Sequence, residues 1–159
     1  ATSLDVIRSM ENIEIINIDD EIERRELEEN DSLRSPRFNA HLLDRLGERH
    51  CVLCNCGISE VIQGAHIWPV SDIKRTSALS LDEKLAYATD GENGLWMCQN
   101  HHKMFDSSIL FLSNNREVSY KTDLSESDKA YIDSITTVTN LPEHLITPRY
   151  MYYIDKRYA

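Results

Sequence analysis

Cys51-Val-Leu-Cys54 and Cys98-Gln-Asn-His101 are the two stretches that decide the fold of this 159-residue chain, and the second runs directly into His102. Each stretch carries two metal-binding side chains separated by two residues. This spacing is typical of structural zinc sites, in which a tight turn brings both side chains of a pair to one ion and two pairs complete a tetrahedron. We therefore predict that these four residues bind Zn²⁺, which leaves His102 for another role.

The composition is that of one domain with a buried core and an appended segment, since 41% of the residues are hydrophobic. The four cysteines could form two disulfides, but the spacings favour reduced, metal-bound thiolates, and Cys56 is then an ordinary small residue. No stretch approaches the roughly 20 apolar residues that span a bilayer, and no signal-peptide pattern is present. We expect a cytoplasmic protein without a membrane partner.

The formal net charge of −10 is unevenly distributed along the chain. Residues 1–31 hold 11 acidic and 3 basic residues, and the rest of the chain holds 16 acidic and 14 basic residues. The acidic start is read as a solvated helical face or tail, or as a segment that contacts a partner or shields a basic groove. An acidic total charge weakens non-specific affinity for DNA without excluding a local DNA site.

The residues between and after the half-sites predict two strands and a helix. Val61–Ile67 has strand character and is ended by Pro69, which cannot donate to a sheet ladder. Leu95–Cys98 is the second strand, and Gly91–Gly94 before it is expected to be a turn, because an Asn-Gly pair tolerates the positive backbone angles of tight hairpins. From Asn100 the pattern becomes helical and gathers one set of side chains on one side: His102, Phe105, Asp106 and Ile109.

Helices and a hairpin are predicted on either side of this centre. A strand at Ile13–Ile18 and a charged helix through about Glu29 precede a helix that begins at Ser35-Pro36. The apolar face of that helix consists of Phe38, Leu42, Leu43 and Leu46. Later elements are a helix at Leu81–Ala88 capped by Ser80, a hairpin of Ile109–Leu112 and Glu117–Tyr120, and a helix at Glu126–Ile135 capped by Ser125.

The last segment, Pro148–Tyr158, carries four tyrosines together with Arg149, Lys156 and Arg157. Tyrosine and arginine can stack on bases or contact phosphates. The favoured interpretation is a terminal helix that packs its aromatic rings on the core.

The centre resembles the HNH endonucleases, the ββα-metal nuclease superfamily, in its zinc-containing branch. The matching residues are Cys51-x2-Cys54, Ala65-His66-Ile67-x-Pro69, Asn93-Gly94-Leu95 and Cys98-x2-His101-His102-x2-Phe105-Asp106. The resemblance covers about residues 38–112 and implies an α+β fold: a ββα-metal core with a zinc knuckle, flanked by helices and a short β-hairpin. The expected segments are an acidic start (1–35), a nuclease core (36–112) and an extension that packs on the core (113–159).

The resemblance also implies roles for the three motif residues. His66 matches the general base, a task suited to a neutral imidazole near pH 7. Asn93 matches the residue whose amide braces the loop and holds the base. His102 matches the metal-binding histidine, nine residues after Asn93, which is the family's interval. The plainer alternatives are a hydrogen-bonded strand histidine for His66 and a simple turn residue for Asn93.

Asp106 follows His102 by four residues, so on a regular helix both side chains lie on one face and can bind the same cation. A carboxylate is a hard donor that favours Mg²⁺ or Mn²⁺; the alternative for Asp106 is a residue that faces solvent. Many family members place a metal ligand just before the base, where this chain has Ala65. The catalytic ion would then have two protein ligands, completed by water and the scissile phosphate.

The resemblance implies a metal-dependent endonuclease that hydrolyses DNA phosphodiester bonds, most similar to bacterial restriction enzymes or related defence nucleases. Double-stranded DNA is the expected partner and a homodimer the expected assembly, because two active sites can cut two strands. Candidate DNA contacts are Lys74, Arg75, Lys103 and Arg116, each of which could instead be ordinary surface charge. The alternatives are a non-specific nuclease toxin and a zinc-stabilised nucleic-acid or protein binding module that has lost turnover.

Overall fold

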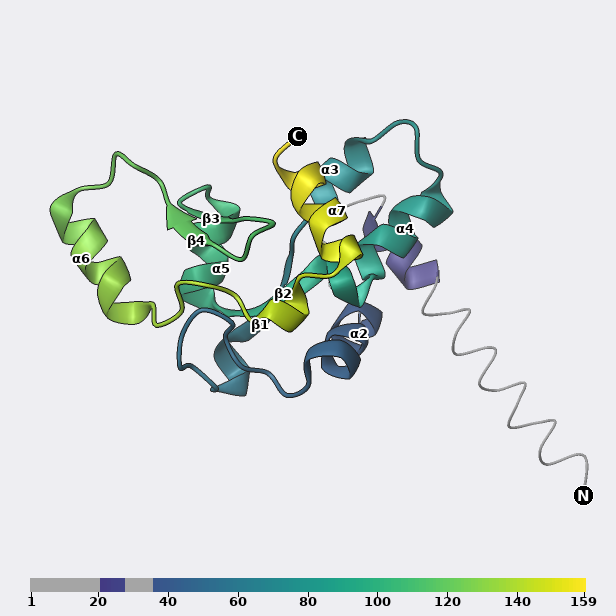
Figure 1. Cartoon of the computed structure of the whole chain (residues 1–159). Coiled ribbons are helices and arrows are strands. Elements are labelled where there is room, and N and C mark those ends of the chain that lie inside the picture. The colour runs from purple at the N-terminus through teal and green to yellow at the C-terminus, as the bar shows by residue number, and fades with distance from the viewer. Residues whose placement is uncertain (1–20, 28–35) are drawn as a thin grey trace, which may run out of the picture.

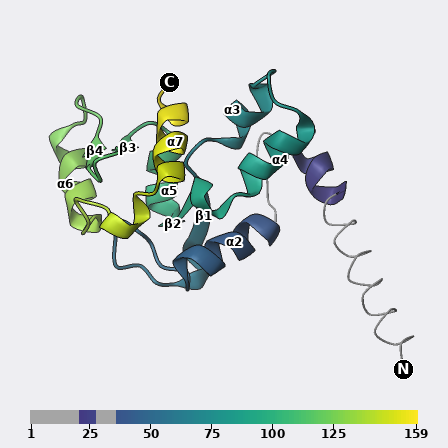
Figure 2. The same cartoon turned by 45° about the vertical axis from the view of Figure 1, so that its right-hand side comes forward.

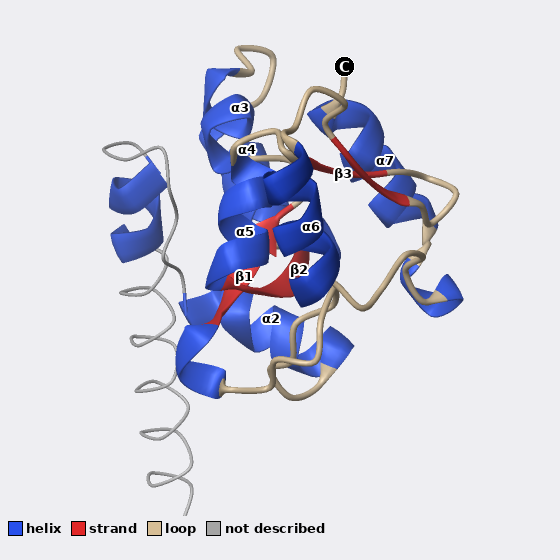
Figure 3. Ribbon diagram, turned by 90° about the vertical axis from the view of Figure 1, so that its left-hand side faces the viewer, coloured by secondary structure: helices blue, strands red, loops and turns tan. Residues whose placement is uncertain are grey.

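The structure is a computed structural model that describes residues 21–27 and 36–159. Its centre is a two-stranded antiparallel sheet of β1 (Ile62–His66) and β2 (Gly94–Cys98), followed directly by α5 (Gln99–Asp106). His66, the last residue of β1, pairs with Gly94, the first residue of β2. Figure 3 shows α5 lying against this sheet. The predicted ββα arrangement within an α+β fold is confirmed.

Helix α2 (Pro36–Leu46) packs on the sheet and begins at the predicted proline. Phe38 and Leu42 are its buried residues, whereas Leu43 is 44% exposed, outside the apolar face to which it was assigned. Close packing requires glycine on the strands: a Cβ on Gly94 would stand 2.5 Å from the Phe38 ring, and one on Gly64 would stand 2.8 Å from Leu42. The two glycines therefore allow Phe38 to lie against the sheet beside His66.

The chain between β1 and β2 is a long helical connection rather than a tight hairpin. It contains α3 (Val70–Arg75), α4 (Leu81–Thr89) and a 3₁₀ turn at Gly91–Asn93. Ser80 caps α4 through a capping box with Glu83, as a serine before a helix predicts. The expectation of positive backbone angles at the Asn-Gly pair was wrong, because Gly94 is extended (φ −161°) and starts a strand. Helix α3 was not predicted.

After α5 the chain forms a second two-stranded sheet, β3 (Leu110–Leu112) with β4 (Val118–Tyr120), then α6 (Glu126–Ile135) and α7 (Pro148–Arg157). The predicted hairpin and both predicted helices are confirmed to within two residues. Buried Tyr150 and Tyr153 pack α7 into the core, in line with the favoured interpretation of the tyrosine-rich end. Figures 1 and 2 show α6 and residues 21–27 at opposite ends of the molecule.

Residues 21–27 are helical and form the described part of the acidic start. Leu27 and Glu23 are buried, Glu23 lies 3.5 Å from Arg37 of α2, and Arg24 pairs with Asp82 of α4. This part of the acidic segment therefore packs on the protein's own helices. The strand expected at Ile13–Ile18 lies outside the described residues, as does the end of the charged helix. Over 21–27 and 36–159, no helix combines the length and apolar character needed to cross a membrane.

Candidate active site and zinc centre

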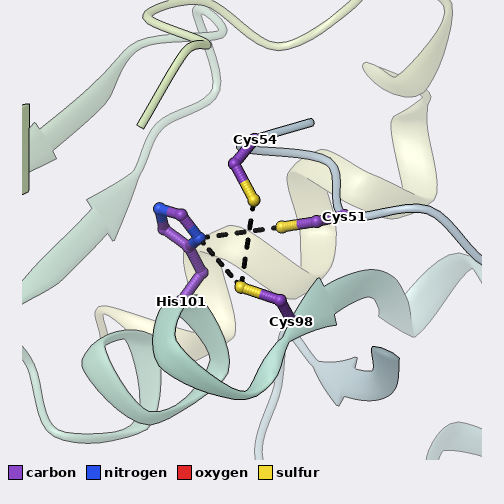
Figure 4. Close-up of side chains that lie close together, drawn as sticks. All are labelled: Cys51, Cys54, Cys98 and His101. Atoms are coloured by element: carbon purple, nitrogen blue, oxygen red, sulfur yellow. Dashed lines mark hydrogen bonds between the residues drawn. The ribbon is translucent and has the colours of Figure 1, made fainter. Parts of the chain in front are cut away.

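Cys51, Cys54, Cys98 and His101 converge on one point, as Figure 4 shows. Their ligand atoms all lie within 4.8 Å of one another. The Cys54 and Cys98 sulfurs are 3.9 Å apart, and His101 Nδ1 lies 3.7 Å from the Cys51 sulfur and 3.2 Å from the Cys98 sulfur. Tetrahedral zinc, with bonds of about 2.0–2.3 Å, separates its ligand atoms by about 3.5–3.8 Å. The four side chains therefore fit the predicted Zn²⁺ in chemistry and in spacing.

The surroundings orient these ligands. The Leu53 backbone N–H donates to the Cys51 sulfur at 3.5 Å. Because Nδ1 of His101 faces the sulfurs, Nε2 carries the proton and donates to Thr136 Oγ1 at 2.9 Å. Thr136 Oγ1 also accepts from the Tyr120 hydroxyl at 3.1 Å. Such outer hydrogen bonds set the tautomer of a metal-binding histidine. The zinc centre is thus tied to residues well beyond its own ligands.

Thr136→Val is expected to weaken zinc affinity by about 10- to 100-fold, the usual effect of losing an outer-shell partner. The substitution leaves the Nε2 proton of buried His101 without its acceptor. Competition against a zinc chelator measures the change. Thr137→Val is the matched control, since the Thr137 side chain is exposed and only its backbone contacts the knuckle. Equal zinc affinity of Thr136→Val and the parent would contradict the assigned hydrogen bond.

His66 lies in an open cleft of about 1050 Å³, between α2, β1, α3, α5 and the end of α7. Its ring stacks on Phe38 at 3.9 Å between centroids, with an angle of 11° between the planes. Nε2 donates to the Ala88 carbonyl at 2.7 Å. This bond assigns the proton of the neutral ring to Nε2, so Nδ1 is the atom with an available lone pair. Among the described residues, none hydrogen-bonds to Nδ1.

The surroundings of His66 keep the ring neutral. Burial lowers the pKa of His66 to about 4, against the raising effect of the hydrogen bond to the Ala88 carbonyl; the smaller effects of His102, which lowers it, and Asp106, which raises it, oppose each other. An imidazole is a proton acceptor only in its neutral form. The ring therefore has the charge state, tautomer and fixed orientation of a general base.

Asn93 is fully buried and is hydrogen-bonded through both ends of its side chain. Its Oδ1 accepts from the Trp68 backbone N–H at 2.7 Å, and its Nδ2 donates to the carbonyls of Trp68 (3.2 Å) and Tyr87 (3.1 Å). The Asn93 carbonyl also accepts from the Ile67 N–H at 3.1 Å. Asn93 thereby joins the residues after His66 to the end of α4, whose Ala88 carbonyl holds the His66 ring.

His102 and Asp106 meet on one face of α5, as their spacing predicted. His102 Nε2 lies 3.1 Å from Asp106 Oδ2, with the two side chains 21% and 53% exposed. Burial raises the pKa of Asp106, but the hydrogen bond and charge of His102 and the charge of Arg157 outweigh it, so the net pKa is lowered. The Gln63 side-chain oxygen lies 2.7 Å from His102 Nδ1. It accepts a hydrogen bond from Nδ1 in the tautomer whose Nε2 carries no proton.

This pair fits a hard divalent cation. Two adjacent ligands of an octahedral ion, at about 2.1 Å each, stand about 3 Å apart, close to the separation of Nε2 and Oδ2. Gln63 then fills the outer position that a metal-binding histidine requires. Ala65 is fully buried and offers no ligand atom. A cation bound at this pair would therefore have two protein side chains as ligands.

The four candidate DNA contacts all lie in the described part of the chain, but none of them lines the cleft. Lys74 and Arg75 are the last two residues of α3, and this helix reaches the cleft through Asp72. Lys103 is exposed on α5. The Arg116 Nε donates to the Leu141 carbonyl at 2.6 Å, which gives this side chain a structural partner.

The cleft residues that sequence reasoning did not single out include Gln63, Arg49 and Arg157. Gln63 is the one amide in a strand of otherwise small or apolar residues before His66, a signal that could have been used. Arg49 lies just before the zinc knuckle, and Arg157 was noted only as part of the tyrosine-rich end. Nothing in their local sequence indicates that they reach the cleft.

The antiparallel strands, the following helix and the zinc knuckle that links them define a ββα-metal centre. Residues 51–112 match the family model described as HNH endonuclease, and this part of the chain is an HNH endonuclease domain. HNH nucleases act on DNA and use divalent metals. Among curated proteins, no match to the chain is found.

Proposed function

We propose that the protein is a metal-dependent endonuclease that hydrolyses phosphodiester bonds of double-stranded DNA, with His66 as general base. The observation that carries this proposal is the state of His66: Nε2 is bonded to the Ala88 carbonyl, Nδ1 is unbonded among the described residues, and the ring lines a cleft shared with His102 and Asp106. Phe38 and Asn93 hold that ring and its acceptor in place.

In the proposed reaction, Nδ1 of His66 removes a proton from a water molecule as that water attacks the phosphorus atom. The Ala88 carbonyl accepts a hydrogen bond from Nε2–H and so stabilises the positive charge that develops on the ring. His102 and Asp106 are the residues that would hold Mg²⁺ or Mn²⁺, and such an ion would supply Lewis-acid stabilisation of the phosphate and the leaving oxygen. Gln63 holds the His102 ring through Nδ1, which leaves Nε2 beside Asp106 as the atom that would bind the cation.

We further propose a restriction-type or related defence role, a homodimeric assembly and a cytoplasmic location. Support for the first is the Ala-His-Ile-x-Pro motif together with a helix that carries Phe38 just before the knuckle. The thiolate-rich zinc site supports a reducing compartment. Two active sites are needed to cut both strands without reorientation. The division into an acidic start, a core and an extension belongs to the same proposal.

Cleavage of plasmid and linear DNA by the zinc-loaded protein, with Mg²⁺ or Mn²⁺, tests this proposal. Discrete fragments would support a sequence-selective enzyme of the restriction type. A smear would favour a non-specific nuclease toxin. DNA binding without cleavage would favour a zinc-stabilised binding module, a reading to which the missing ligand at Ala65 lends support.

Arg49 is the residue of the cleft that we expect to contact a DNA phosphate. Its guanidinium lies 5.2 Å from the centre of the Trp96 ring, and within the described part of the chain it makes no hydrogen bond or ion pair. Arg49→Met, made in a His66→Ala background, should therefore weaken DNA binding and lower the slope of log affinity against log salt by about 0.9. Fluorescence anisotropy over a series of salt concentrations measures this slope.

The control is Lys129→Met, which removes a positive charge from exposed α6, outside the cleft. Its salt slope should equal that of the His66→Ala protein. An unchanged slope for Arg49→Met as well would show that Arg49 does not neutralise a phosphate.

A further inference from the structure

Arg157 joins the two halves of the candidate active site although it lies near the end of the chain. From the last turn of α7, its Nη1 donates to the Ile67 carbonyl at 2.9 Å and, less closely, to the His66 carbonyl at 3.4 Å. Its Nη2 donates to the Phe105 carbonyl at 2.7 Å, and its guanidinium carbon lies 3.6 Å from the centre of the Phe105 ring. One planar group thus bonds to two separate segments of backbone.

These two segments carry different parts of the chemistry. His66, the base, is the last residue of β1, and Ile67 follows it directly. Phe105 lies on α5 between His102 and Asp106, the pair that would hold the cation. A guanidinium has donors in a fixed planar arrangement, so a bond from each terminal nitrogen sets the separation of its two acceptors. The distance between base and cation site is therefore constrained by a residue outside the ββα unit.

The anchoring of α7 does not depend on Arg157. Tyr150, Tyr153 and Ile154 are buried in the core, and the Tyr158 hydroxyl accepts from the Leu112 backbone N–H at 3.1 Å. Loss of the guanidinium should leave the helix docked. It would remove the bonds to the three carbonyls while the hydrophobic contacts of α7 persist.

We propose that Arg157 is a positioning residue, which sets the distance between His66 and the His102/Asp106 pair through the carbonyls of residues 66, 67 and 105. The inference rests on the proposed nuclease function and extends it: the catalytic unit is larger than the matched residues 51–112 and includes the C-terminal helix. A misplacement of about 1 Å between reacting groups can cost about 100-fold in rate. Loss of Arg157 should therefore lower kcat. The guanidinium bonds to backbone carbonyls and not to the side chains of His66, His102 or Asp106, so it acts through their positions.

The test compares the parent with Arg157→Met, Arg157→Lys and the same-helix charge control Lys156→Met. We expect Arg157→Met to lower kcat by about 10- to 100-fold, with KM and the midpoint of thermal unfolding close to those of the parent. Arg157→Lys should recover part of kcat, because an ammonium can donate to the same carbonyls. Lys156→Met should cleave at the parent's rate. Mn²⁺ affinity, measured by titration without DNA, should not fall, because both cation ligands lie on α5 and loss of the Arg157 charge removes a repulsion from the cation.

Several results would overturn this role. Equal kcat for Arg157→Met and the parent would do so. A kcat that falls in proportion to thermal stability, and that Arg157→Lys does not restore, would also do so. If Arg157→Met does not fold, Arg157→Lys decides alone: a folded, fully active lysine variant would exclude dependence on the guanidinium geometry. A folded parent that cuts no DNA would overturn the proposed function and the role of Arg157 with it, whereas an active parent with an equally active Arg157→Met overturns the role alone.

Discussion

Cys98→Ser is expected to unfold the centre of the protein, rather than only slow a reaction. Binding of structural zinc in small zinc peptides is worth about 10–16 kcal/mol of apparent folding free energy, which is comparable to or larger than the total stability of a typical domain. The sheet here has two strands of five residues, and its connection to α5 passes through Cys98 itself. Loss of one thiolate therefore removes the ion that joins the knuckle, β2 and α5.

Circular dichroism and zinc content of purified Cys98→Ser test this expectation, together with removal of zinc from the parent by a chelator. Cys56→Ser is the matched control, because Cys56 is partly buried beside the knuckle but outside the four-ligand group. The control should keep one zinc per chain and the parent's spectrum. A folded, zinc-free Cys98→Ser protein with the parent's thermal stability would contradict a structural role for the metal.

His66→Ala is expected to reduce the cleavage rate by at least the 10²- to 10⁴-fold that positioned proton transfer contributes, with zinc content and fold retained. The substitution removes the base and leaves the cation pair on α5 intact. A single-turnover cleavage assay measures the rate. The control is His144→Ala, since His144 is exposed and lies outside the cleft. A His66→Ala protein within tenfold of the parent would exclude the assigned base.

The pH profile of the parent provides a second readout of His66. The pKa of His66 is lowered to about 4, so the ring is neutral and active above that pH and becomes protonated, and inactive, as the pH falls through it. At saturating Mn²⁺, the protonation of His66 should therefore leave the cleavage rate unchanged from pH 8 to about 5. A base with the ordinary histidine pKa of about 6.5 would already have lost half its activity at about pH 6.5 and nearly all of it at about pH 5.

Sequence reasoning succeeded where the meeting of side chains depends on local spacing. The zinc ligands follow from two pairs of cysteine and histidine residues, and the meeting of His102 with Asp106 follows from a helical offset of four. The caps at Ser80 and Ser125 were equally local. In each of these cases the deciding partners lie within one turn of helix or one tight loop.

The features that escaped prediction depend on packing between distant segments. The Asn93-Gly94 pair suggested positive backbone angles in a tight turn, but Gly94 is extended, and it is a glycine because Phe38 packs against its backbone. Arg157 bonds to carbonyls more than 50 positions earlier in the chain. No periodicity or motif in a single sequence carries such information, because the contacts exist only after the helices have docked.

The most direct measurement of the central claim is conversion of supercoiled plasmid to open or linear DNA by the parent and by His66→Ala, with Mg²⁺ or Mn²⁺ added and the zinc content of both proteins verified. We expect the parent to cut only when the divalent cation is present, and His66→Ala to leave the plasmid intact under the same conditions. Equal cutting by the two zinc-loaded proteins, or none by a folded parent, would contradict the claim that His66 is the general base of an active nuclease.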